Sequence, residues 1–497
     1  MLRVLVLATL WVWHAVAVLS LPDADFEDLV PVPRHVWDKS LTPSAEGAAS
    51  VELADHERFV WASSESPSEK SIVVNMVTYS KQHERIIDMD RFSFALDDET
   101  SCNVDNFSLR FKHPLIYEAA KTAWNWVNYD DLRSFVIVPS WKGCGDHRSH
   151  EPWVVTKVEF DDDASKVVLD AALSTWKKVM NTFVLDFGEA ALEGCSDKHD
   201  IIPEINNRLA LDITSSFPKE LFSWEPETRT PHARLKAICN GCGTEGAVVV
   251  SGHVEAGRSS TGIEVNKFEL SVKPQGVKTH VGVSLAFDGE ANFRGSTQQP
   301  SREINLVNIP LSGWRIPGVS QFGPSISINA GYTIDYISGS GVFTTGVTAS
   351  IPDTAIANLD LKAANSGQTF GWKPDIQVNP LALNAQVDSQ TRLYIEIVVT
   401  VSITVLDDNG FGVDLSLKIP QLTMTTSGGV NAQGFCEPNG SVLGVKADST
   451  VGVNLSLQGW AEVGGHRIVL ANVTLVNDPD LFTFPEVCEA FSNPLDG

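Results

Sequence analysis

The densest group of metal-ligating side chains in the sequence lies within one short segment. It consists of Cys144, Asp146, His147 and His150. A thiolate, a carboxylate and two imidazoles could together hold an ion such as zinc. If Cys144 forms a disulfide with Cys102, however, its sulfur is no longer a thiolate ligand. We therefore expect a solvated loop closed by a disulfide, without a cofactor, and keep the metal site as the alternative.

Seven cysteines fall into three groups along the chain, and this grouping predicts disulfides within each group. The groups are Cys102 and Cys144; Cys195, Cys239 and Cys242; and Cys436 and Cys488. A strand pattern follows Cys239-x-x-Cys242, whereas a thioredoxin-like redox pair needs a helix there and a zinc ribbon needs a second pair. We therefore expect Cys195 to bridge to Cys239 or Cys242, which leaves one thiol of this group unpaired. Such disulfides form in an oxidising compartment.

Motifs for nucleophilic or nucleotide chemistry do not stand out. The sequence has neither a Gly-x-Ser-x-Gly elbow nor a His-Glu-x-x-His motif. The glycine-rich run at Gly339, Ser340 and Gly341 lacks the lysine of a phosphate-binding loop. Two carboxylates could serve a glycosidase, but no local pattern singles out a pair among 62 acidic residues. We predict no catalytic or cofactor-binding residues, and keep an extracellular hydrolase as an alternative.

Three tryptophans are candidates for binding sugar rings. Trp314, Trp372 and Trp460 each follow a glycine, a position typical of loops and strand ends. An exposed aromatic face there could stack on the axial C–H groups of a sugar. The opposing interpretation is that these side chains fill a core, because tryptophan is highly buried on average.

The charge of the chain excludes some partners. Lys and Arg total 37 against 62 Asp and Glu, which gives a formal net charge of −25. A nucleic-acid-binding protein needs a basic surface, and an anionic membrane would repel this chain. We expect neither partner.

The first 20 residues have the pattern of a secretory signal peptide. Arg3 precedes an apolar run, and small residues follow it. No later segment is apolar over a membrane-spanning length, so we expect an exported protein without a membrane span. The candidate glycosylation sites are the sequons at Asn106, Asn439, Asn454 and Asn472. Asn454 and Asn472 alternate with apolar residues, which predicts that they lie on solvent-facing sides of strands.

Shifts in composition divide the rest of the chain. We expect an acidic flexible extension at 21–70, an α+β domain at 71–190, a linker at 191–236, an antiparallel β domain at 237–490 and a tail at 491–497. Within the α+β domain, Pro114 is expected to begin a helix, and the residues 161–165 to form a tight acidic turn.

The clearest strand runs from Leu393 to Val405, with every odd position apolar. The return strand, Val413 to Ile419, has the same parity. A three-residue loop, 408–410, then pairs Val405 with Val413, with Gly410 in the left-handed conformation. Strands with one apolar face predict a mainly β fold: an antiparallel sandwich or an open barrel, unless the apolar faces line a cavity.

The sequence also resembles a family of secreted ascomycete fungal proteins. The resemblance rests on 239–243 (Cys-Asn-Gly-Cys-Gly), Ile309-Pro310, 316–318 (Ile-Pro-Gly) and 323–325 (Gly-Pro-Ser) in the C-terminal part, and on Cys102, 124–126 (Trp-Asn-Trp) and Cys144 in the N-terminal part. It implies secretion and two modules, a small α+β module and a larger β module. Both are domains of unknown function, so the resemblance assigns no catalytic residues.

Together these observations predict a secreted, non-catalytic protein of the cell wall or extracellular matrix. We expect the β domain to bind polysaccharide or a surface protein. The alternatives are the hydrolase and a carrier of apolar ligands. A filled core with surface aromatic side chains would favour the binding protein. A cleft with two convergent carboxylates would favour the hydrolase, and a cavity lined by the odd residues of 393–405 would favour the carrier.

Overall fold

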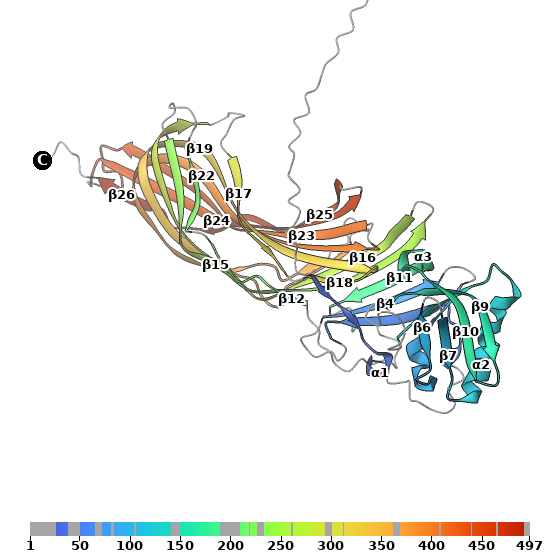
Figure 1. Cartoon of the computed structure of the whole chain (residues 1–497). Helices are drawn as coiled ribbons and strands as arrows, with labels where there is room; N and C mark the ends of the chain where they lie inside the picture. The colour runs from blue at the N-terminus through green and yellow to red at the C-terminus, as the bar shows by residue number, and fades with distance from the viewer. Residues whose placement is uncertain are drawn as a thin grey trace, which may run out of the picture.

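A computed structural model describes most of the chain (Figure 1). The described residues are 26–37, 50–64, 72–80, 84–103, 106–140, 150–188, 209–217, 219–225, 233–259, 262–293, 301–311, 313–360, 368–406, 409–438, 440–463 and 466–491. The expected signal peptide and the 491–497 tail beyond residue 491 lie outside them.

The N-terminal part contains short elements in two groups. A compact unit spans β5 to β10 (residues 85–173). The elements that precede and follow it in the chain are β1 (Phe26–Asp28), β2 (Val30–Pro31), α1 (Arg34–Trp37), β3 (His56–Ala62), β4 (Val73–Ser80), α3 (Trp176–Val179) and β11 (Met180–Phe187). The compact unit holds β5 (Arg85–Asp88), η2 (Met89–Arg91), η3 (Ser93–Ala95), β6 (Ser101–Asn103), β7 (Asn106–Arg110), α2 (Pro114–Trp124), η4 (Asn125–Tyr129), β8 (Phe135–Val138), β9 (Trp153–Asp161) and β10 (Lys166–Leu173).

The compact unit is a small α+β fold. Its sheet has the order β5-β8-β9-β10-β7-β6. Helix α2 begins at Pro114, as predicted, because a helix's first N–H has no partner for proline to remove. The helix buries Ile116, Ala120 and Trp124, and the Trp124 indole donates a hydrogen bond to the carbonyl of Val51 at 2.8 Å. The acidic turn joins β9 to β10 as expected.

The C-terminal part is nearly all strand, and several strands are very long. Its elements are β12 (Leu209–Asp212), β13 (Ser215–Ser216), β14 (Glu220–Trp224), β15 (Ala233–Ser259), β16 (Gly262–Asn292), β17 (Ser301–Pro310), β18 (Gly313–Ile316), β19 (Ser320–Ser350), β20 (Ile356–Asp360), β21 (Gln368–Phe370), β22 (Asp375–Val405), β23 (Asn409–Val430), β24 (Leu443–Val463), β25 (His466–Thr483) and β26 (Val487–Phe491).

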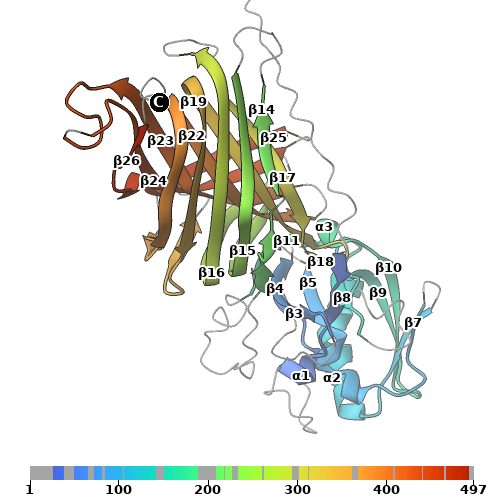
Figure 2. The same ribbon diagram turned by 90° about the vertical axis from the view of Figure 1, so that its left-hand side faces the viewer.

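One large sheet joins these strands to the N-terminal part. Antiparallel pairings run in the order β3-β4-β11-β15-β16-β19-β22-β23-β24-β25. The short strands β12, β13 and β14 pair with β15, and β26 continues the edge of β25 along β24. Figure 2 shows β15, β16, β19 and β22 side by side in this sheet. The protein is therefore mainly β, with a large antiparallel sheet and a small α+β unit.

Two segments contain more structure than their composition suggested. The acidic 21–70 segment, expected to be a flexible extension, supplies β3, and Trp61 in that strand is fully buried. The expected linker at 191–236 supplies β12 and β14, which pair with β15. Both expectations are corrected for the described residues. A few apolar residues are enough for a short strand when neighbouring strands supply the hydrogen bonds, so charge and proline nearby do not prevent it.

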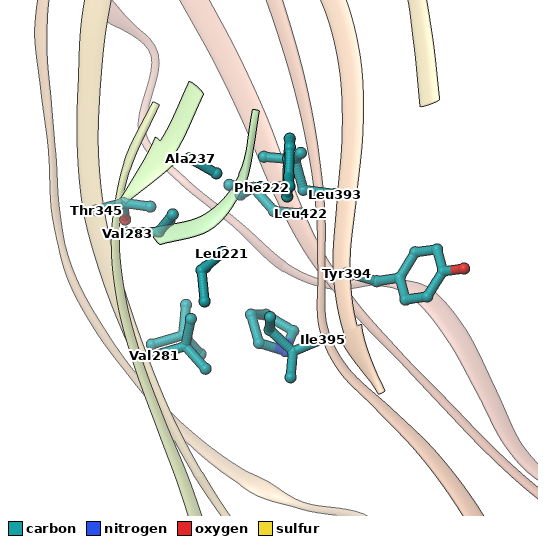
Figure 3. Close-up of a pocket in the computed structure, with 12 residues that line it drawn as sticks. Leu221, Phe222, Ala237, Val281, Val283, Thr345, Leu393, Tyr394, Ile395 and Leu422 are labelled. Carbon is teal, nitrogen blue, oxygen red and sulfur yellow. The ribbon is translucent and has the colours of Figure 1, made fainter. Parts of the chain in front are cut away.

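The large sheet curls so that its apolar face packs against itself. Val248 of β15 and Val277 of β16 line a cavity of about 20 Å³ together with Val399 of β22 and Leu455 of β24. A second cavity, about 30 Å³, is lined almost wholly by apolar side chains, among them Leu393 and Ile395 (Figure 3). Each has room for about one water molecule. The odd-numbered face of β22 therefore packs into a filled core at these two places.

The β22–β23 hairpin has the predicted parity but a different turn. Val405 pairs with Asn409 and Val401 with Val413, so Gly410 belongs to the return strand and not to the turn predicted at 408–410. Leu406 has a φ of 51°, is buried, and donates a backbone hydrogen bond to Val319 at 2.8 Å. Both registers place apolar residues opposite apolar ones, so the alternation could not distinguish them. Burial of Leu406 outweighs the glycine preference.

Candidate functional site

A polar groove crosses the outer face of the large sheet over β22, β23, β24 and β25. Its volume is about 380 Å³. Its lining consists of Glu396, Val398, Asp414, Ser416, Lys418, Gln421, Asn454, Ser456, Gln458 and Asn472. We call this feature the polar groove. Only one of these side chains is apolar.

The register of the sheet builds the polar groove. Three rows cross the four strands: Glu396, Lys418, Asn454 and Asn477; Val398, Ser416, Ser456 and Thr474; and Thr400, Asp414, Gln458 and Asn472. The intervening residues, such as Ile397, Leu415 and Leu455, point to the opposite face and are buried. Because side chains alternate along a strand, the same pattern that fills the core collects polar groups on the other face.

Glu396 is held within a hydrogen-bonded cluster at one end of the polar groove. Its side chain accepts hydrogen bonds from Ser416 and from Asn329, the latter at 3.4 Å. The Lys418 ammonium lies 3.5 Å from the carboxylate. Glu396 is buried, so these partners replace the water that a carboxylate would otherwise require.

Asp414 lies at the other end of the polar groove, where three side chains contact its carboxylate. It accepts hydrogen bonds from the Thr400 hydroxyl at 3.0 Å and from the Trp460 indole at 3.2 Å. Arg467 forms an ion pair with the same carboxylate. The Arg467 guanidinium also lies 4.1 Å from the centre of the Trp460 ring, in a cation–π arrangement.

Two aromatic rings flank the polar groove, and each covers a glycine on the neighbouring strand. A Cβ atom at Gly412 would lie 2.1 Å from the Trp460 ring, and one at Gly331 would lie 2.1 Å from the Tyr394 ring. The Tyr394 hydroxyl donates to Glu303 at 2.8 Å, and both burial and this bond raise the pKa of Tyr394. Such aromatic–glycine pairs stiffen a sheet where glycine alone would weaken it.

The polar groove contains two carboxylates, Glu396 and Asp414, at its two ends. Glu396 and Thr400 lie four residues apart on β22, and Thr400 pairs with Asp414. At about 3.3 Å per residue, the two acidic positions are about 13 Å apart along the strands. Each carboxylate is already held within the sheet, Glu396 by Ser416 and Lys418 and Asp414 by Thr400 and Arg467. What the polar groove offers instead is a set of hydrogen-bond donors and acceptors.

The structure buries all three tryptophans that were predicted to bind sugar rings. Trp314 is fully buried and stacks on Phe322 at 5.4 Å, and Trp372 is buried with its indole donating to the Ile356 carbonyl at 2.9 Å. Neither ring presents a face to solvent, so the core interpretation holds for both. Trp460 flanks the polar groove, but it is only 7% exposed and Arg467 lies over its ring, so it offers no open face to a sugar either.

Two of the four sequons line the polar groove. Asn454 is half-buried and donates to Asn477 at 3.2 Å, whereas Asn472 is exposed. The prediction that both lie on the polar face of their strands is confirmed by the groove lining. The Asn106 side chain and Asn439 lie outside the described residues.

The two disulfides whose cysteines are both described lie within the predicted groups, with one correction. Cys436 pairs with Cys488 as expected. Cys239 pairs with Cys242, so the preferred bridge to Cys195 is wrong. A bulge in β15 at this point brings the two cysteines to the same face, with a Cα–Cα distance of 5.9 Å. Cys102 is disulfide-bonded, and both Cys144 and Cys195 lie outside the described residues.

The candidate metal loop is only partly described. Cys144, Asp146 and His147 lie outside the described residues. His150 is buried between Phe59 and Trp61, with ring centres 5.5 and 5.8 Å away, and burial lowers the pKa of His150 to about 3. Within the described part of the chain, no cluster of His, Cys, Asp and Glu could hold a metal ion.

Sequence reasoning missed most of the polar groove. It identified Asn454 and Asn472, but not Gln421 or Gln458. These side chains belong to no motif, and only the register of four strands brings them together. The signal that could have located them is the polar half of each alternating strand. The apolar half of the same alternation predicts the core face.

Comparison with known proteins gives a family but no activity. Residues 211–469 match a family described as a domain of unknown function (DUF7223), and residues 79–184 match another domain of unknown function (DUF7029). These two matches agree with the two-module layout that the resemblance implied. The curated proteins and the solved structures contain no match to this chain. Because the first match covers just over half of the 497 residues, the protein belongs to the DUF7223 family.

Proposed function

We propose that this protein is a secreted, non-catalytic binding protein that holds an uncharged polysaccharide of the cell wall or extracellular matrix in the polar groove. The observation that carries the proposal is the lining itself. Amide and hydroxyl side chains such as Gln421, Ser456 and Gln458 can both donate and accept, which matches the hydroxyl groups of a sugar. A volume of about 380 Å³ is within the range of ligand sites.

The charges of the polar groove favour a neutral ligand. Glu396 is balanced by Lys418, and Asp414 by Arg467. The rest of the chain carries a large excess of acidic residues, so an anionic polymer would meet repulsion before it reached the sheet. A neutral glucan or chitin meets none. Binding through hydrogen bonds to a neutral polymer should also depend little on salt.

Secretion is supported by the disulfides and by the signal-like N-terminus. The bridges Cys239–Cys242 and Cys436–Cys488 suit an oxidising compartment. In the portion of the chain that the structure describes, none of the helices has the length and hydrophobicity to cross a bilayer.

The two alternatives draw less support. The internal partners of Glu396 and Asp414 speak against hydrolysis in the polar groove, because hydrogen bonds and a cation already engage each carboxylate. The two apolar cavities have room for about one water each, which is too small for an apolar ligand such as a fatty acid.

Co-sedimentation with insoluble glucan and chitin, at low and high salt, tests the proposal. We expect wild-type protein to bind at both salt concentrations and to release no soluble sugar. The double variant Gln421→Ala/Gln458→Ala should bind about tenfold more weakly, because two hydrogen bonds of about 0.5–1.5 kcal/mol each are lost. Gln377→Ala is the matched control, since Gln377 is exposed on β22 outside the polar groove. Equal binding by the double variant and by Gln377→Ala, or release of soluble sugar, would contradict the proposal.

A further inference from the structure

The sequons at Asn454 and Asn472 lead into the same space. Both asparagines line the polar groove, and so does Ser456, the third residue of the first sequon. Thr474, the third residue of the second, pairs with Ser456 across β24 and β25. A glycan attached at either asparagine would therefore begin inside the site that is proposed to bind sugar.

The two asparagines differ in how well the folded protein can accommodate a glycan. The Asn454 side chain is half-buried and held by Asn477 at 3.2 Å. Asn472 is exposed and lies on β25, which pairs with β24 and with no other strand among those described. Strand β25 also exposes Ile468 at 50% and Val469 at 53%, four and three residues before Asn472. A glycan at Asn472 would start at the rim of the polar groove without displacing a buried contact.

We propose that Asn472 carries an N-linked glycan that lies in the polar groove and competes with external polysaccharide. The part concerning competition rests on the proposed function; the placement of the glycan does not. In the modification, the Asn472 amide nitrogen attacks the anomeric carbon of a lipid-linked glycosyl diphosphate. The new N–C bond replaces the C–O bond to the diphosphate, which leaves, and the amide loses one proton.

Tethering makes the glycan an effective competitor. A group on a short flexible link has an effective concentration of about 1 mM at a nearby site. If a sugar of this kind binds the polar groove with a Kd of about 0.1 mM, the site is free about one tenth of the time. External polymer then binds about tenfold more weakly than it binds a protein without this glycan. Removal or trimming of the glycan would open the site.

Thr474 allows a matched test in full-length protein secreted from a eukaryotic host. Thr474→Ala removes the sequon and leaves Asn472 in place, whereas Thr474→Ser keeps the sequon. Mass spectrometry of glycopeptides measures occupancy at Asn472. Binding to glucan and chitin is then compared among wild type, Thr474→Ser and Thr474→Ala. We expect occupied Asn472 in the first two, and about tenfold tighter binding by Thr474→Ala.

A second readout does not depend on the polysaccharide. Lys418 lines the polar groove with 29% of its side chain exposed, so a glycan there should slow its acylation by an amine-reactive reagent. Lys446 on β24, 39% exposed and outside the lining, is the control and should react equally in all forms. Faster acylation of Lys418 in Thr474→Ala than in Thr474→Ser supports the placement of the glycan.

The outcomes separate the two proposals. Slow acylation of Lys418 in glycosylated protein, with no polymer binding by any form, supports the glycan's placement and contradicts the proposed function. Equal acylation and equal binding in all forms would overturn the inference and leave the function standing. An unmodified Asn472 in the secreted protein would also overturn it.

Discussion

At the residue scale, His253 lies between two carboxylates outside the polar groove. Its Nδ1 lies 2.6 Å from Asp186 and its Nε2 lies 2.9 Å from Glu255. Asp186 is buried and also accepts a hydrogen bond from Asn75 at 3.4 Å. The bond to Asp186, above all, raises the pKa of His253 to about 9, although burial and Lys267 act in the opposite direction. A charged histidine therefore links β11 to β15.

We predict that this histidine makes stability depend on pH. The folded-state pKa lies above the unfolded value of about 6.5, so the stabilisation is complete below pH 6.5 and is lost as pH rises through about 9. His253→Gln should therefore lower the midpoint of urea unfolding most at pH 6 and least at pH 10. His280→Gln, at an exposed histidine of β16, is the control. A difference between wild type and His253→Gln that stays constant from pH 6 to pH 10 would contradict this account.

At the element scale, alternation made the strands predictable, while their ends and neighbours depended on contacts far along the chain. The parity of 393–405 was evident, yet the turn was set by the burial of Leu406 against Val319. The strand β3 was missed because its apolar run, 59–62, is short and lies in an acidic, proline-rich segment. The polar groove could not be assembled from sequence, since Ser416 and Ser456 are adjacent only through the register of β23 and β24.

The edge strand β25 shows how this large sheet limits pairing with other chains. Leu470 and Leu475 have no partner residue on β24, so β25 is bulged at these positions, and Pro479 lies within the strand. Bulges and proline at an edge interrupt the row of free backbone groups that another strand would use. The remaining part of that edge is β26, which is held to the rest of the sheet by the Cys436–Cys488 disulfide.

We predict that Cys488→Ser loosens β26 more than the rest of the sheet. The bridge closes a sequence separation of 52 residues, and loss of a disulfide of this span costs about 2–4 kcal/mol. Amide hydrogens of 487–491 should exchange faster in the variant, while those of β22 should change little. The double variant Cys436→Ser/Cys488→Ser should behave like the single one, because the same bridge is absent. Unchanged exchange at 487–491 would show that the strand pairing alone holds β26.

At the scale of the whole molecule, the large sheet crosses the two regions that the family matches define. Strands β4 and β11 lie largely before or within the first matched region, yet β11 pairs with β15 in the second. The ring centre of Phe187 in β11 lies 5.3 Å from that of Phe322 and 6.0 Å from that of Trp314, and both of these residues belong to the second region. The N-terminal strands thus complete the core of the C-terminal sheet, which explains why Trp314 is buried and not exposed.

This shared core predicts that the large sheet unfolds in one cooperative transition that includes β4 and β11. Phe187 is fully buried and lies against Gly252, where a Cβ atom would be 2.2 Å from its ring, so Phe187→Ala leaves a cavity that the surrounding strands cannot easily fill. We expect a loss of about 3–5 kcal/mol and a shift of the whole transition, measured by calorimetry and by near-ultraviolet circular dichroism of the tryptophans. Phe370→Ala is the control, because Phe370 is 70% exposed, and it should change stability by less than about 0.5 kcal/mol. If Phe187→Ala instead split the unfolding into two transitions and moved only the earlier one, the N-terminal strands would be a separate unit resting on the sheet, and the shared core would not be the source of its stability.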